Sequence, residues 1–371
     1  MIKILGKVRG RFSSPTIFIG LALGLLPLYG AFSGWPIVTS VFALALIAVG
    51  CLTSLIYFRK KLNLGPKWIY IPLLIILGSG LLRTIIGGEG LNTSGTYMLY
   101  LLIMFGLFMT VRIKGESVLW IVVPIVIVYG TCVLVDEVMN LGFRASGLSG
   151  NPNLIAAMLA FCIFFLRGKW KWLIPLALAA IVCTGSYWAL GALVVCGLFK
   201  LVRPGLHLGE GLFGFTSGLL AVVVVLLLVL GAFGSVWNVD KVSNIFLIAK
   251  SEGFVEGIDS ATHRLDDYRY VRDNFSFFGN GLLNASQVTN YRVIHNVPLM
   301  IADELGILAA LAWLFTMVFG IYKVPKYRLV LLVMLLISVT GCYWFWHWAS
   351  LGTCYWLTMG LVSKESMPVS I

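Results

Sequence analysis

The sequence predicts an all-α integral membrane protein with about twelve transmembrane helices, and its composition is the first observation that does so. Hydrophobic residues make up 60% of the 371 residues, charged residues make up 11%, and the mean hydropathy is +0.97. A soluble domain carries roughly 25% charged residues, so in water this chain would expose large apolar patches. In lipid, backbone amides must pair within the protein, which leaves helices or a closed barrel. The apolar runs lack a period of two, which favours helices.

The second observation is the length of the apolar runs, which approach the ~20 residues that a helix needs to cross a bilayer. The first run lacks a cleavage site, so we interpret it as a retained helix and not as a signal peptide. A tight turn at Thr184-Gly185-Ser186 has to separate two short runs. The expected spans are 15–33, 36–58, 68–87, 95–111, 117–135, 152–166, 170–184, 186–201, 211–234, 298–322, 328–343 and 346–363.

The third observation is the distribution of charge, which sets the orientation. With the N-terminus inside, the segments expected inside hold 19 of the 27 Lys and Arg residues but only three of the 15 acidic residues. This is the positive-inside pattern, and it predicts a multi-pass membrane protein with both termini in the cytoplasm. The basic residues form no single patch, so the net charge of +12 does not indicate nucleic-acid binding. The inside segments are 1–14, 59–67, 112–116, 167–171, 200–210, 323–328 and 364–371.

The chain is expected to form one membrane domain, 1–371, with a long extracytoplasmic loop at 235–297. Long loops among short turns are usually functional. Within this loop, 260–275 is predicted to be a helix, and Gly279 and Gly281 then mark a turn. Four apolar residues at helical spacing are expected to share one face of that helix: Leu265, Tyr268, Val271 and Phe275.

The polar segment 144–153 is the first of three local patterns that could carry chemistry. It begins with Arg144, and it ends with Asn151 as a helix cap and Pro152 as the first helical residue. A helix start with free N–H groups beside an arginine suits a phosphate. The alternative is an ordinary loop and helix cap.

The other two patterns lie in and after the long loop. His263 and Arg264 belong to the predicted loop helix, where the alternative is a solvated basic face. His295 precedes a predicted span, and histidines there are more often interface residues than catalysts. Asp303 and Glu304 follow about two turns into that span, where ionisable groups are costly and indicate function.

Taken together, these patterns resemble the O-antigen ligase and polysaccharide polymerase superfamily of bacterial membrane glycosyltransferases. The resemblance covers roughly residues 144–310, and its strength lies in the order and spacing of the motifs. The segments that carry it are Arg144-Ala-Ser-Gly147, Gly150-Asn-Pro-Asn-Leu-Ile-Ala-Ala157, Thr184-Gly-Ser186, Arg264 with Phe278-Gly-Asn-Gly281, and His295-Asn296 with Glu304-Leu-Gly306.

The resemblance implies a GT-C-like fold and a glycan donor linked to undecaprenyl pyrophosphate, presented at the outer leaflet of the inner membrane. It further implies inverting transfer to an acceptor hydroxyl, on a sugar or a lipid-linked acceptor, without metal or cofactor. His295 would be the general base, and Arg264 would bind the pyrophosphate. The supporting residues would be Asn153, Asn296, Glu304, Arg83 and His263.

One departure from the family pattern concerns the pyrophosphate site. Family members usually carry a second pyrophosphate-binding arginine directly after the threonine-glycine-serine turn, whereas Tyr187 and Trp188 follow it here. Arg144 or Arg83 would be substitutes; a different donor or a reduced activity are the alternatives.

Two questions about function stay open in the sequence. A ligase and a repeat-unit polymerase differ in the acceptor, which depends on cavity shape. A transporter or flippase for a lipid-linked sugar is the rival from another class. It would show broken helices and charges near the membrane midplane, whereas a transferase would gather its charges at one outer face.

Overall fold

The computed structural model describes residues 44–52, 66–86, 91–110, 115–139, 145–149, 151–202, 267–281, 294, 296–340 and 349–366. Within these ranges every regular element is a helix, so the all-α prediction is confirmed for this part of the chain. The expected spans 15–33 and 211–234 lie outside the described residues, and only 44–52 of the span 36–58 is described.

Helices occupy each expected span between 68 and 201 and between 298 and 363. Two further short helices lie at 44–52 and 267–273. The labelled α-helices are α4 (Lys67–Ile86), α5 (Leu91–Thr110), α6 (Gly115–Met139), α7 (Pro152–Ile163), α8 (Leu173–Cys183), α9 (Tyr187–Val202), α14 (Val297–Leu305), α15 (Ile307–Lys323), α16 (Arg328–Thr340) and α17 (Ala349–Glu365). The 3-10 helices are η3 (Gly147–Ser149), η4 (Gly168–Trp172) and η5 (Pro325–Tyr327).

Two of these helices are long and apolar enough to cross a membrane alone: α4, and the part of α6 from Ile121 to Met139. A third span results if Ile307–Lys323 and Pro325–Val339, which are bent by 110° relative to each other, are taken as one. Shorter apolar helices lie at Met98–Met109, Pro152–Ile163 and Trp188–Phe199. The 12 residues of α7 extend roughly 18 Å, against a hydrocarbon core of about 30 Å. The described part is therefore helical and suited to a membrane, and the number of twelve spans stays a prediction.

The expected single span 298–322 is wrong, because the structure breaks it into α14 and α15. The break lies at Gly306, whose φ of 92° and ψ of 168° are incompatible with a helix. Asp303 and Glu304 therefore lie in the last turn of a nine-residue helix and not two turns into a long one. Apolar spacing continues through the break, so the periodicity of the sequence did not reveal it.

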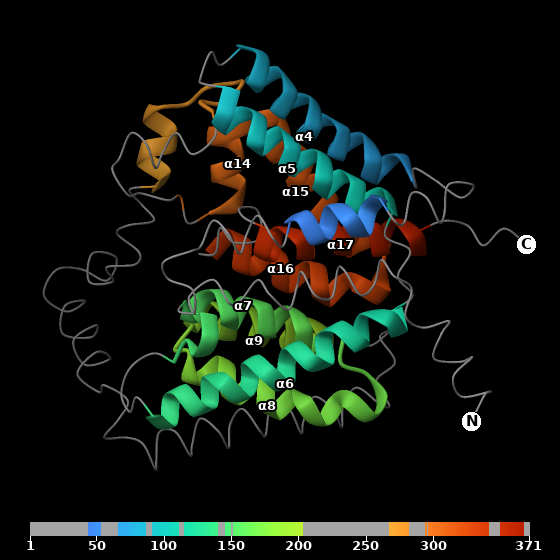
Figure 1. Ribbon diagram of the computed structural model, residues 1–371, viewed down its shortest axis with the longest axis vertical. Coiled ribbons are helices and arrows are strands. Elements are labelled where there is room, and N and C mark those ends of the chain that lie inside the picture. Colours follow the sequence, from blue (N-terminus) through green and yellow to red (C-terminus); the bar gives the residue numbers. More distant parts are fainter. Residues whose placement is uncertain are drawn as a thin grey trace, which may run out of the picture.

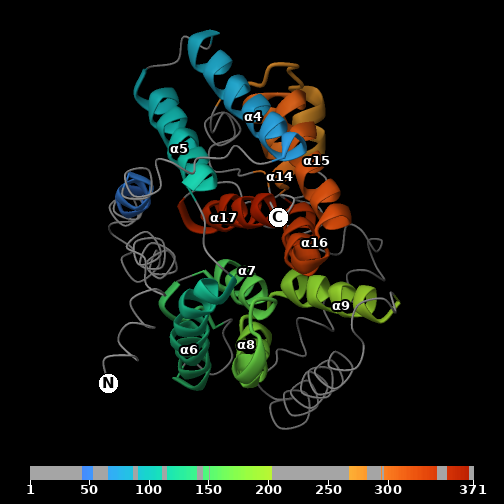
Figure 2. The ribbon, with the colours of Figure 1, turned by 90° about the vertical axis from the view of Figure 1, so that its right-hand side faces the viewer.

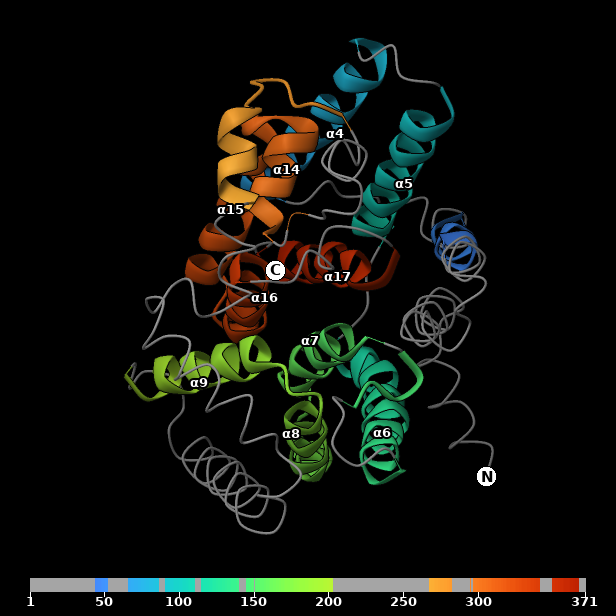
Figure 3. The ribbon, with the colours of Figure 1, turned by 90° about the vertical axis from the view of Figure 1, so that its left-hand side faces the viewer.

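In space, α16 and α17 lie between two groups of helices. Figure 1 shows α4, α5 and α15 on one side of them and α6, α7, α8 and α9 on the other, and Figures 2 and 3 show the same layers from the two sides. The two helices that are long and apolar enough to cross a membrane alone, α4 and α6, thus belong to different groups. The layer between them contains buried aromatic side chains such as Tyr355 and Trp356 of α17.

Several segments that the charge pattern places in the cytoplasm contact one another at one end of the molecule. Phe165, after α7, packs against Tyr327 of η5 with ring centroids 6.4 Å apart. Lys326 Nζ forms an ion pair with Glu365 Oε2, at the end of α17, over 2.7 Å. We call this the basic end, defined by 165–171, 323–328 and Glu365.

The opposite end of the molecule is set by the antiparallel packing of α4 and α15. Trp68, at the start of α4, meets Phe319, near the end of α15, with ring centroids 5.0 Å apart. The end of α4 therefore lies beside the start of α15, where Arg83 Nη2 donates to the carbonyl of Asn280. We call this the distal end, defined by Arg83, Asn280 and residues 303–307.

Candidate functional site

The predicted site residues divide into two sets. Four of them, Arg144, His263, Arg264 and His295, lie outside the described residues. The other four, Arg83, Asn153, Asn296 and Glu304, are described, and the segments next to the first set are described in part. The site is therefore built from the framework around the predicted catalytic groups.

Asn296, which follows His295 in the sequence, is the N-cap of α14. Its side-chain oxygen accepts from the backbone N–H of Leu299 over 3.0 Å. Its side-chain N–H2 donates to the carbonyl of Val339, near the end of α16, over 2.9 Å, and to the hydroxyl of Tyr268 over 3.3 Å. One buried amide thus joins the start of α14, the end of α16 and the loop helix 267–273.

Two glycines from separate motifs face each other at the distal end. Gly279 has φ 81° and Gly306 has φ 92°, a region that L side chains rarely adopt. A Cβ on Gly279 would lie 2.5 Å from the carbonyl oxygen of Glu304, and a Cβ on Gly306 would lie 2.4 Å from the carbonyl oxygen of Phe277. Only glycine at both positions lets the 277–281 turn and the 303–307 break touch through their backbones.

Hydrogen bonds hold these two segments together. Asn280 donates from its backbone N–H to the Asp303 carbonyl and from its side chain to Asp303 Oδ1 over 2.8 Å. Gly281 N–H donates to the Glu304 carbonyl, and Ile307 N–H donates to the Phe277 carbonyl, each over 3.3 Å.

The same contact accounts for one of the two buried acidic side chains of this region. Asp303 and Glu304 are both almost fully buried, which costs free energy unless the carboxylates are paired or hydrogen-bonded. Asp303 receives its hydrogen bond from Asn280, whose carbonyl in turn accepts from Arg83 Nη2. Arg83, expected as a substitute for the missing arginine, thus uses one of its amino groups to hold the 277–281 turn.

The described part of the loop helix runs over 267–273, with Asp267 and Val271 buried. It ends before Phe275, so Phe275 does not share a helix face with Val271 as expected. Tyr268 lies on the helix and is exposed. Residues 260–266, which include Leu265, lie outside the described residues.

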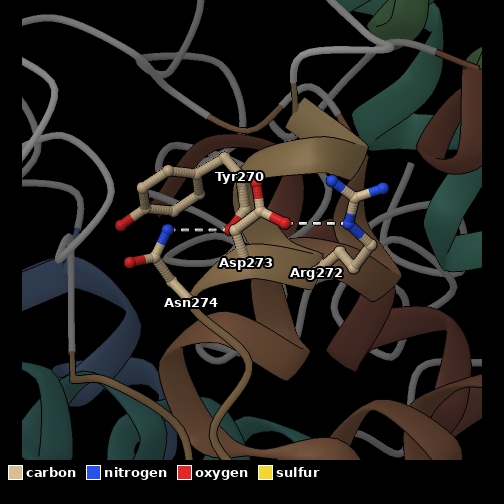
Figure 4. Close-up of polar contacts among 4 residues, drawn as sticks. All are labelled: Tyr270, Arg272, Asp273 and Asn274. Atoms are coloured by element: carbon tan, nitrogen blue, oxygen red, sulfur yellow. Dashed lines mark hydrogen bonds and ion pairs between the residues drawn. The ribbon is translucent and has the colours of Figure 1, made fainter.

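Polar contacts close the end of the loop helix, as Figure 4 shows. Asn274 Nδ2 donates to the carbonyl of Tyr270 over 2.9 Å, and Arg272 Nε donates to Asp273 Oδ1 over 2.8 Å. The Arg272 hydrogen bond holds the pKa of the Asp273 carboxyl below its ordinary value. Burial, followed by the nearby negative charge of Asp303, raises the pKa of Tyr270 above its ordinary value. Tyr270 thus links the loop helix electrostatically to the buried acid.

A second polar cluster surrounds the segment that follows Arg144. Ser146 N–H and Gly147 N–H both donate to Asp136 Oδ2, over 2.7 and 2.8 Å. Ala145 N–H donates to the carbonyl of Cys183, the last residue of α8, over 3.2 Å. The end of α6 and the end of α8 therefore fix the backbone next to Arg144.

The helix cap and the turn predicted in this region are confirmed. Asn151 Oδ1 accepts from the N–H groups of Asn153 and Leu154 at the start of α7. Thr184 ends α8 with its hydroxyl donating to the Ile181 carbonyl, and Ser186 N–H donates back to the Thr184 hydroxyl. Asn153, predicted as a supporting residue, lies in the first turn of α7.

Both clusters lie toward the same end of the molecule. The helix α16 runs away from η5 at the basic end, so its last residues, including Val339, lie at the other end. The helix α7 runs the opposite way, because the chain just after it reaches Tyr327 through Phe165. The Asn151 cap at the start of α7 thus lies at the same end as the Asn296 contact with Val339.

Sequence reasoning missed two residues of this framework, Asp136 and Asn280. Asp136 directly follows the expected span 117–135, and an acid shortly before a Ser-Gly segment was a usable signal for a loop anchor. Asn280 stood inside the quoted Phe278-Gly-Asn-Gly281 motif, but only its flanking glycines were interpreted.

Comparisons of this chain with protein families, with characterised proteins and with solved structures find no match.

Proposed function

We propose that this protein transfers a glycan from undecaprenyl pyrophosphate to an acceptor hydroxyl at the outer face of the bacterial inner membrane, as an O-antigen ligase or a polysaccharide polymerase does. The proposal includes the predicted orientation, with both termini in the cytoplasm and about twelve spans. It requires no metal or cofactor.

The observation that carries the proposal is the gathering of four separate motifs at one end of the helices. Segments 145–151 and 184–186 form one cluster, and segments 277–281 and 296–306 form the other. In a lipid-linked transfer, the reacting groups belong at the lipid–water boundary, where the donor has its headgroup. Described parts of three segments expected in the cytoplasm, 167–171, 323–328 and 364–371, lie at the opposite end.

The proposed chemistry rests on two predicted residues. His295 acts as general base, because a neutral imidazole with a pKa near ~6.5 accepts a proton at neutral pH. Arg264 donates two parallel N–H groups to the pyrophosphate as negative charge grows on the leaving group. Asn296, as the cap of α14 and the partner of α16, supports the backbone beside His295.

A transporter or flippase for a lipid-linked sugar is the second candidate, and the break at Gly306 is the observation that favours it. Transporters use broken helices with charged groups around the membrane midplane. This break, however, lies beside the end of α4, where Arg83 reaches the 277–281 turn. A helix break at one end of the bundle fits a surface site better than a path through the bilayer.

Chemical analysis of surface glycans in a deletion strain tests the proposal. Loss of chain length with single units still attached indicates a polymerase. Loss of attachment with accumulation of lipid-linked polymer indicates a ligase. Accumulation of lipid-linked single units confined to the cytoplasmic leaflet indicates a flippase and contradicts the proposal.

A further inference from the structure

One face of α15 is continuously apolar and exposed. Its exposed residues recur at helical spacing along the whole helix: Leu308, Leu311, Phe315, Val318 and Tyr322. Helix α4, which packs antiparallel to α15, exposes a similar series that ends with Ile85 and Ile86 at the distal end. In a chain of this composition these faces contact lipid, because no other solvent suits such a surface.

Three phenylalanines of the long loop continue this surface at the distal end. Phe275, Phe277 and Phe278 expose 58%, 50% and 57% of their surface. The rings of Phe277 and Phe278 meet edge to face with centroids 5.1 Å apart. We call these three residues the phenylalanine patch.

The backbone fixes the phenylalanine patch at the start of the lipid-facing stripe. The Phe277 carbonyl accepts from the N–H of Ile307, and Leu308, the first residue of the stripe, follows directly. A Cβ on Gly306 would lie 3.0 Å from the Cα of Phe278, so the backbone of this turn packs directly against the helix break. The patch is therefore held beside the point where α15 begins.

We propose that the phenylalanine patch inserts into the membrane surface, so that segment 267–281 of the extracytoplasmic loop is an interfacial anchor in contact with lipid. Aromatic rings accumulate at membrane–water interfaces, and apolar faces of surface-lying segments enter the boundary between headgroups and acyl chains. The patch continues two lipid-facing helices, whereas the end of the loop helix is polar: Arg272 donates to Asp273, and Asn274 donates to the Tyr270 carbonyl (Figure 4). The inference holds whether or not the protein is a glycosyltransferase.

Other occupants of an exposed aromatic patch are a sugar ring and a second copy of the chain. Continuity with the faces of α4 and α15 favours lipid over both. The second copy of the chain becomes an outcome of the experiment.

Photo-crosslinking from single positions tests the anchor without interference from the 12 tryptophans and seven cysteines of the chain. The full chain is placed in nanodiscs of phosphatidylcholine with phosphatidylglycerol, and Phe278→p-benzoylphenylalanine is irradiated. Adducts are identified by mass spectrometry. Leu82→p-benzoylphenylalanine, on the exposed face of α4, is the positive control. Asn274→p-benzoylphenylalanine, on the same loop segment, is the matched control for a water-facing position.

The anchor predicts lipid adducts at position 278 in yields similar to those at position 82 and several-fold above those at position 274. These adducts should persist in high salt, because apolar insertion is not screened as electrostatic attraction is. Lipid adducts at position 82 but not at 278 would overturn the proposal. So would crosslinks between two copies from position 278, or loss of the lipid adducts in high salt.

Discussion

Replacing Gly279 with alanine should separate the 277–281 turn from the helix break at Gly306. The new Cβ would lie 2.5 Å from the Glu304 carbonyl oxygen, 2.6 Å from its carbon and 2.7 Å from the Gly306 nitrogen. All three atoms belong to backbone, so no side-chain rotation relieves the clash. The two segments must move apart, and the hydrogen bonds between them must weaken.

The expected cost follows from two terms. A non-glycine residue at φ 81° costs about 1–2 kcal/mol. Four hydrogen bonds cross the contact, from Asn280 N–H, Asn280 Nδ2, Gly281 N–H and Ile307 N–H, and each contributes about 0.5–1.5 kcal/mol. The local stability of this contact should therefore fall by about 3–8 kcal/mol.

Hydrogen exchange in nanodiscs measures this loss at the amides of Gly281 and Ile307. Exchange there should accelerate by roughly 10²–10⁶-fold. Gly168→Ala is the matched control, because Gly168 has φ +55° but nothing within 4 Å of a new Cβ, so it should lose only the conformational term of about 1–2 kcal/mol. An equal loss of local stability in the two variants would refute the backbone contact. Unchanged hydrogen exchange in Gly279→Ala would refute it as well.

Three further predictions concern topology and the pyrophosphate site. Reporter fusions at Lys61 should report the cytoplasm and fusions at Gly257 the opposite side, because of the charge asymmetry; a cytoplasmic signal at Gly257 would overturn the orientation. Arg264→Lys keeps the charge but loses the bidentate geometry, so transfer should fall sharply at unchanged expression, and wild-type turnover would exclude a geometric role. If Arg144 replaces the missing arginine, Tyr187→Arg should be tolerated and should partly restore transfer in Arg144→Ala; a folded double variant without recovery would count against the substitution.

The positions of most described helices could be predicted from the sequence. The expected span 68–87 is helix α4 at Lys67–Ile86, and 152–166 begins with α7 at Pro152 behind its Asn151 cap. Long apolar runs and local capping residues contain this information, because both act over a few neighbouring residues.

The break at Gly306 could not be predicted in the same way, because its cause lies elsewhere in the chain. The Gly279 turn packs against it and fixes its geometry. The anchoring of Ser146 and Gly147 by Asp136 likewise depends on how α6 and α8 meet. Sequence spacing also did not distinguish an apolar face that contacts protein from one that contacts lipid.

Phe275 shows this second limit most clearly. Its helical spacing from Val271 predicted a shared helix face, but the described helix ends at 273, and Val271 is buried while Phe275 is exposed. In a membrane protein an apolar residue can face protein or lipid, and the periodicity is the same in both cases. Only the packing of the loop segment on α14 and α15 resolves the ambiguity.

The central claim is tested most directly by transfer in vitro from a purified lipid-linked donor, with His295 variants and with chelator. His295→Ala should stay inserted and folded and lose transfer by roughly 10²–10⁴-fold, the usual size of a general-base contribution. His295→Gln, which can hydrogen-bond but is not a useful base, should be nearly as poor, and chelator should have no effect. Near-normal transfer by the glutamine variant would leave His295 only a positioning role. Loss of wild-type activity with chelator would contradict the metal-independent mechanism.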